Sequence, residues 1–158
     1  MDRYRDEYGL KVQVLDNKSI PMELADPDRE QVGGIALMEY MDRHFPEAYA
    51  DPDAILIGLT PVDMYFEQRD WRFAFWVSNE QIHKGVVSYK RMDPETFGMD
   101  RNDDLLNTRV RKVVTHLIGT LYYGLPGSDD PRSVMYNNVL SLDDLDLMGE
   151  ELPIEASR

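Results

Sequence analysis

The 158-residue sequence contains no cysteine, so it can form no disulfide bond, no thiolate metal ligand and no thiol nucleophile. Histidine is also scarce, with three residues, His44, His83 and His116. No apolar run approaches the roughly 18 residues that would cross a membrane. Basic residues number 17 against 30 acidic ones, and the formal net charge is −13. We therefore expect a soluble protein whose partners include neither nucleic acid nor a membrane.

The remaining composition is that of a globular chain. Hydrophobic residues make up 42% of the sequence, and there is no internal repeat. This length suits one domain, so we expect a single domain over residues 1–158, with a core from about 10 to 151 and a frayed tail over 152–158. The first residues, MDRYRDEYG, carry several charges and no apolar core, so no secretory signal is visible. The cellular compartment stays open.

The first third of the chain predicts a strand, a helix and a second strand. Residues Leu10–Leu15 alternate apolar and polar side chains, which is the period of a half-buried strand. Asp26 and the proline after it are typical of a helix start, and we expect a helix over residues 28–44. The run Ala54–Leu59 is apolar without alternation and predicts a central strand covered on both faces. Such a unit would join two parallel strands by a right-handed crossover.

The middle of the chain predicts two more strands. Trp71–Val77 is rich in aromatic residues, and Val86–Tyr89 follows after a short loop. A tight connection favours antiparallel neighbours. After an acidic loop, Asn102 or Asp103 would cap a long helix that ends before Gly124. The pattern as a whole predicts the α/β (α+β) class: a twisted mixed sheet of four to five strands with an antiparallel edge strand, two long helices and a short C-terminal helix.

The long helix carries a pattern related to metal binding. His116 and Thr120 lie one turn apart on the same helix face. Zinc proteases present a histidine from a helix, a second ligand four residues later and then a glycine turn. In this sequence the first histidine of such a pattern is present and the second is not.

Several segments resemble one known family. They are the run DPDAILIGLTPVDMY, the strand WRFAFWV, the segment GVVS with RM after it, the helix RVRKVVTH and the segment SVMYN. In this order they resemble the metzincin zinc metalloproteases, and archaemetzincins most of all. The resemblance extends from about residue 10 to 151. It implies a zincin-like fold in which the long helix carries the motif HExxHxxGxxH and a methionine turn lies under the metal.

The resemblance places the family's functional positions on mostly unsuitable residues. The first zinc histidine falls on His116, and the general-base glutamate falls on Leu117. The second histidine falls on Thr120, a weak neutral oxygen ligand at best. The third falls on Pro126, or on Gly127 if one residue is inserted, and neither offers a side-chain ligand. The resemblance thus implies a degenerate zinc motif with no intact catalytic residue.

Met135 matches the methionine turn, so the scaffold beneath the site is expected to be kept. A catalytic zinc needs three protein ligands, a bound water and a carboxylate base. One imidazole does not meet that need. The cysteines with which archaemetzincins bind a second zinc are also missing. We therefore expect no metal and no other cofactor, although the family uses zinc.

Other candidate residues have two interpretations each. His116 is either a ligand or a buried histidine bonded to a neighbour. Asp129 and Asp130 could replace the missing ligands, but an acidic pair beside a serine and a proline is typical of a solvated turn. Four aromatic residues could line a peptide groove or fill the core: Trp71, Phe73, Phe75 and Trp76.

Three functional hypotheses follow. The leading one is a metalloprotease homologue that has lost its zinc ligands and base, a pseudoenzyme that binds an extended peptide or a protein along its edge strand. The second is an active zinc-dependent peptidase with unusual ligands. The third is a structural or oligomerising domain whose edge strand pairs with another copy. The sequence leaves the ligand, the oligomeric state and the biological process open.

Overall fold

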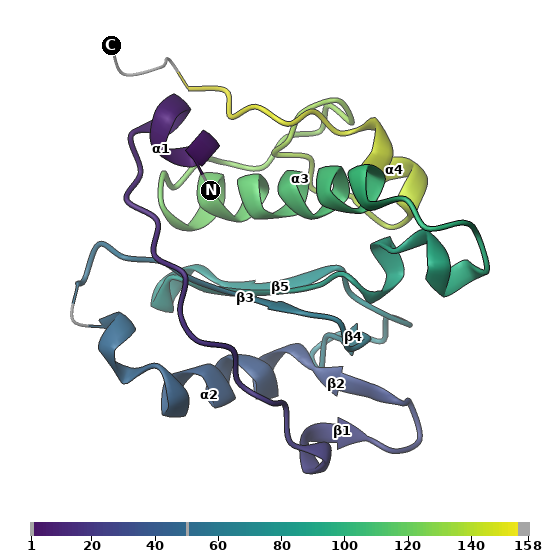
Figure 1. Cartoon of the computed structure of the whole chain (residues 1–158). Coiled ribbons are helices and arrows are strands. Elements are labelled where there is room, and N and C mark those ends of the chain that lie inside the picture. The colour runs from purple at the N-terminus through teal and green to yellow at the C-terminus, as the bar shows by residue number, and fades with distance from the viewer. Residues whose placement is uncertain (1, 50, 155–158) are drawn as a thin grey trace.

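The computed structural model describes residues 2–49 and 51–154, which form three layers (Figure 1). A three-stranded sheet in the middle consists of β3 (Leu56–Thr60), β6 (Lys84–Ser88) and β5 (Trp76–Asn79). Helix α2 (Gly34–His44) covers one face of this sheet. Helix α3 (Asp103–Leu121) covers the other. The arrangement confirms the predicted α/β class with its two long helices.

The order of strands in this sheet is β3, β6, β5. β5 is antiparallel to β6 and lies at an edge, as predicted, whereas β3 is parallel to β6. The prediction that Ala54–Leu59 forms the central strand is wrong, because β6 holds that place with all five residues buried. β3 lies at the other edge, and Leu59 is 51% exposed. A continuous apolar run indicates that both faces are covered, but it does not report which strands lie beside it.

A second sheet consists of β1 (Ala25–Asp26), β2 (Gln31–Gly33) and β4 (Met64–Tyr65). β2 pairs antiparallel with β1 and parallel with β4. The strands are therefore divided into two sheets of three, where the sequence predicted one sheet of four to five strands. Each sheet contains one antiparallel and one parallel pair of strands, as expected of the α+β class.

The predicted strand Leu10–Leu15 and its crossover are wrong. These residues form no helix or strand, and Val12 and Val14 are 41% and 71% exposed. Their alternation is suitable for a strand, yet a strand forms only where a partner meets its backbone groups. The segment instead connects α1 (Asp2–Tyr8) to the β1 hairpin, across the layers (Figure 1).

Helix α2 begins at Gly34, six residues later than predicted. The Asp26 carboxylate does cap a turn, but that turn joins β1 to β2. The N-terminus of α2 is capped from elsewhere: the Glu67 carboxylate accepts hydrogen bonds of 3.0 Å from the backbone N–H groups of Ile35 and Ala36. A carboxylate at this end also interacts favourably with the helix dipole.

The second half of the chain follows the prediction more closely. The Asn102 side chain accepts a bond from the N–H of Leu105 and so caps α3, which is 19 residues long. Ser141 caps the short helix α4 (Leu142–Leu147) in the same way. No helix in residues 2–49 and 51–154 is both long enough and apolar enough to cross a bilayer.

Both ends of the described chain pack on the side of α3 that faces away from the sheet (Figure 1). In α1, Tyr4 is 8% exposed and its hydroxyl lies 3.1 Å from Thr115 Oγ1. At the other end, Leu152 is 6% exposed and belongs to the core. Buried residues of the described chain therefore extend beyond residues 10–151 at both ends. Residues 155–158 of the predicted tail lie outside the described residues.

Candidate functional site

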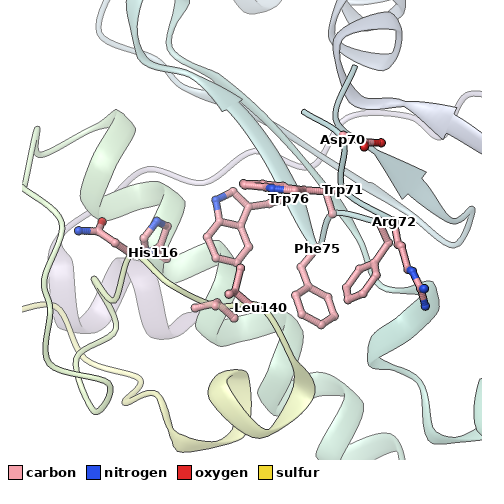
Figure 2. Close-up of a pocket in the computed structure, with 11 residues that line it drawn as sticks. Asp70, Trp71, Arg72, Phe75, Trp76, His116 and Leu140 are labelled. Carbon is pink, nitrogen blue, oxygen red and sulfur yellow. The ribbon is translucent and has the colours of Figure 1, made fainter. Parts of the chain in front are cut away.

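A cleft of about 490 Å³ lies between the segment that leads into β5 and the loop before α4 (Figure 2). The upper rim is formed by residues 70–76, and the lower rim by residues 137–140. His116 of α3 is the lining residue from the long helix. All four aromatic residues that the sequence singled out line this cleft: Trp71, Phe73, Phe75 and Trp76.

The upper rim differs from the predicted strand Trp71–Val77. Strand pairing begins only at Trp76, so the strand is five residues shorter at its start than predicted. Within this segment Phe75 is 4% exposed and belongs to the core, whereas Trp71 is 48% exposed. Phe75 therefore packs in the core, whereas the interpretation as a peptide groove stays a prediction for the exposed Trp71.

His116 is 7% exposed, and its Nδ1 lies 2.9 Å from the carbonyl oxygen of Val134. A carbonyl can only accept, so Nδ1 carries the proton and Nε2 of the neutral ring is left as an acceptor. Burial lowers the pKa of His116, and the bond to Val134 offsets this only in part. The Trp76 ring lies 4.9 Å from the imidazole, between His116 and Phe75 (Figure 2).

The position of the family's general base lies in the core and outside the cleft lining. Leu117 has no exposed surface, and its Cδ1 would be 3.0 Å from a Cβ added to Gly85 of β6. Leu117 therefore fills the space between α3 and the sheet. Thr120, at the second ligand position, donates its hydroxyl to the His116 carbonyl at 3.1 Å. This bond within the helix uses its only proton.

The third ligand position, Pro126, is exposed in the loop after α3. Asp129 and Asp130 are also exposed, and Asp130 Oδ1 accepts a bond from the N–H of Arg132, which supports the interpretation as a turn. Among the residues with described positions, no group of three or more His, Cys, Asp or Glu side chains could hold a metal ion. The side chains around His116 thus do not fit a catalytic zinc, which needs three protein ligands.

Met135, the residue expected at the methionine turn, lies in a tight turn that packs against α3. Met135 is 2% exposed and lies in a turn closed by a bond from the N–H of Tyr136 to the Ser133 carbonyl. Its Sδ would be 2.5 Å from a Cβ added to Gly119 of α3. Glycine at 119 therefore permits the close approach of this turn to the helix.

The lower rim was not predicted from the sequence. Asn137, Val139 and Leu140 line the cleft, and Leu140 is 69% exposed. Their signal was weak, because the segment has neither helical nor strand periodicity. Their position directly after Met135 was the available clue, since that turn returns the chain to α3.

A smaller hollow of about 300 Å³ adjoins the cleft and shares Phe73, Phe75 and Leu140 with it. Arg91 and Phe97 complete its walls together with residues 141–143. The two hollows therefore adjoin each other beside the segment that leads into β5.

Two comparisons with known sequences bear on this arrangement. No family profile matches the chain. The archaemetzincin of Thermococcus kodakarensis is 32% identical over 149 residues, which covers 93% of this chain and 76% of that protein. The archaemetzincin of Pyrococcus horikoshii is 26% identical over 144 residues, covering 87% of this chain and 72% of its relative.

Solved structures show the same fold. A zinc-dependent peptidase from Methanocorpusculum labreanum superposes with a TM-score of 0.78 at 25% identity, covering 95% of this chain and 85% of that one. The archaemetzincin of Archaeoglobus fulgidus has a TM-score of 0.71 at 20% identity, over 94% of this chain and 81% of its own. Sequence and structure agree, and the chain belongs to the archaemetzincin family of zinc-dependent peptidases.

Proposed function

We propose that this chain is a catalytically inactive member of its family that binds an extended peptide in the cleft. The observation that carries the proposal is the position of Leu117. A carboxylate that activates a metal-bound water must reach the metal, and this position is filled by a fully buried leucine packed on β6. His116 alone is then a hydrogen-bonding group of a binding cleft.

The edge of β5 supports a peptide as the ligand. The N–H of Ser88 donates to the Phe75 carbonyl at 2.9 Å, and Trp76 is opposite Val87 in the antiparallel register. Because bonding alternates along an antiparallel pair, the backbone groups of Trp76 and Ser78 are directed away from β6. An extended peptide could add a strand there, since its main chain would satisfy these groups.

The apolar rims would then contact the side chains of the peptide. Trp71 on the upper rim and Leu140 on the lower rim are both large and well exposed, at 48% and 69%. Exposed apolar side chains facing one groove are typical of interaction sites. Trp71 and Leu140 would bury apolar side chains of the peptide, while the edge of β5 would bind the main chain of the peptide.

The inactive state is tested by metal content. We expect the purified, tag-free protein, after incubation with excess zinc and gel filtration, to retain well under one equivalent of zinc by mass spectrometry. No cleavage of an unfolded protein such as casein is expected at any zinc concentration. One equivalent of zinc, together with peptidase activity that disappears in His116→Ala, would show that the chain is an active peptidase with unusual ligands.

The binding role is tested with an array of immobilised decapeptides of varied sequence. Both tryptophans of the chain line the cleft, so a peptide that binds should also change the tryptophan emission in solution. Leu140→Asp should weaken the best decapeptide about tenfold, which corresponds to about 1.4 kcal/mol. Met22→Asp is the matched control, because Met22 is 90% exposed and outside the cleft lining. Equal binding by both variants would contradict the proposed cleft.

A further inference from the structure

We infer that Gln31, a buried side chain of β2, is a positioning residue for the upper rim of the cleft. It is the centre of a polar cluster, here called the rim network, that consists of Arg29, Gln31, Asp63 and Arg91. None of the first three lines the cleft. The structural part of this inference stands by itself, whereas its effect on ligand affinity rests on the proposed peptide-binding function.

The first part of the upper rim, residues 71–73, needs such support because it lacks strand pairing. In the described chain no backbone–backbone hydrogen bond reaches Trp71, Arg72 or Phe73. The carbonyl groups of Trp71 and Arg72 are held by side chains instead. Gln31 Nε2 donates to the Arg72 carbonyl at 2.9 Å, and Arg29 Nη2 donates to the Trp71 carbonyl at 2.6 Å.

Both N–H groups of the Gln31 amide donate hydrogen bonds in this network. Its Nε2 donates a second bond, of 2.9 Å, to Asp63 Oδ2, and its Oε1 accepts from Arg29 Nε at 3.1 Å. The side chain is 4% exposed, so water cannot easily replace these partners. A buried amide with each group paired holds its neighbours in one geometry.

Asp63 connects this arrangement to the next rim residue. Its carboxylate accepts bonds from Arg91 Nε and Nη2, the shorter of them 2.7 Å long. The Arg91 guanidinium in turn lies 4.5 Å from the centre of the Phe73 ring, within the range of a cation–π contact. The rim network thus contacts three consecutive residues, through the carbonyls of Trp71 and Arg72 and the ring of Phe73.

The consequence is a preformed rim. Segments with few backbone bonds open at low free energy, and a ligand that had to order them would bind more weakly. The rim network removes this cost before a ligand arrives. Gln31 acts through the rim and does not contact a ligand in the cleft.

The ligand-free test uses Trp71 as the reporter. In a Trp76→Phe background Trp71 is the single tryptophan, and its quenching by acrylamide measures its access to solvent. Gln31→Leu should increase the quenching constant about twofold and shift the emission to the red. Tyr4→Phe is the control: it removes a buried hydrogen bond on the far side of α3 and should leave Trp71 unchanged. If Gln31 were merely structural, Gln31→Leu and Tyr4→Phe would both lower the melting temperature, and the quenching of Trp71 would be the same in the two variants.

If Gln31→Leu does not fold, Arg29→Met replaces it, because Arg29 is exposed and its loss leaves no buried group behind except the Gln31 oxygen. We expect the same direction of change, with Arg29→Lys intermediate because it keeps a donor. An unchanged Trp71 in the folded variants would overturn the inference.

The affinity test uses the decapeptide that binds the unmodified chain best. Gln31→Leu should weaken it about tenfold, and Tyr4→Phe should not. If Trp71 is released in Gln31→Leu while no decapeptide binds the unmodified chain, the positioning role stands and the proposed function fails. If a decapeptide binds and Gln31→Leu neither releases Trp71 nor weakens binding, the inference fails and the proposed function stands.

Discussion

The side of α3 toward α4 and the side toward the cleft differ in how many hydrogen bonds their buried polar side chains form with other elements. Toward α4, two buried cations each form at least two hydrogen bonds. Arg109 forms a two-bond pair with Asp146, and Lys112 donates to the Leu145 and Asp146 carbonyls at the end of α4. Toward the cleft, His116 has one bond to Val134, and the Thr120 hydroxyl bonds within its own helix. α3 therefore has more side-chain hydrogen bonds to other elements toward α4 than toward the cleft.

If the zinc motif is altered as proposed, this difference explains how the family fold can persist. The contacts that position α3 come from its apolar face on the sheet, from α1 and from α4. None of them passes through the positions of the second and third zinc ligands. Substitution at Thr120 or Pro126 therefore leaves the position of the helix intact. Leu117 is the exception, since it belongs to the core.

The largest effect is expected from Leu117→Glu. This substitution introduces a glutamate at the position that corresponds to the family's general base. A carboxylate would be buried against β6 without a partner, and we expect a loss of about 4 kcal/mol or more in the free energy of unfolding. Urea denaturation followed by circular dichroism measures it. Leu117→Met, a change of similar volume, should cost only about 1 kcal/mol. If Leu117→Glu were as stable as Leu117→Met, position 117 would face solvent and the contrast between the two sides would be wrong.

The same contrast explains what the sequence could predict. The cap at Asn102 and the period of α3 are encoded within a few neighbouring residues, and both were predicted. Leu10–Leu15 was mispredicted because an alternating pattern is local, whereas a strand also needs a partner, and no described strand pairs with this segment. The rim network was invisible for a related reason: Gln31 and Arg72 are 41 residues apart, and neither residue carries a motif.

A smaller effect is expected where α3 meets α4. Arg109→Met removes the pair with Asp146 and the bond to the Met92 carbonyl, and it should lower the free energy of unfolding by roughly 2 kcal/mol. The loss is moderate because the Asp146 side chain is 40% exposed and water can solvate it. Arg101→Met is the control, since that arginine pairs with Asp103 at the surface and should change the urea midpoint little. Equal midpoints for the two variants would mean that the α4 contact does not hold the helix.

The smallest effect concerns pH and the rim network. Burial opposes ionisation of Asp63, but hydrogen bonds from Arg91 and Gln31 outweigh it, and the pKa of Asp63 lies below its ordinary value of 3.8. A carboxyl with a lower pKa in the folded chain stabilises the fold above about pH 4, and this stabilisation is lost as the pH falls through the folded-state pKa. Asp63→Asn should therefore show a smaller fall in urea midpoint between pH 5 and pH 3 than the unmodified chain. Asp100→Asn, in the loop before α3, should retain the full fall. If Asp63→Asn behaved like Asp100→Asn, the carboxylate would not be held by its partners, and the upper rim would depend on Arg29 and Gln31 alone.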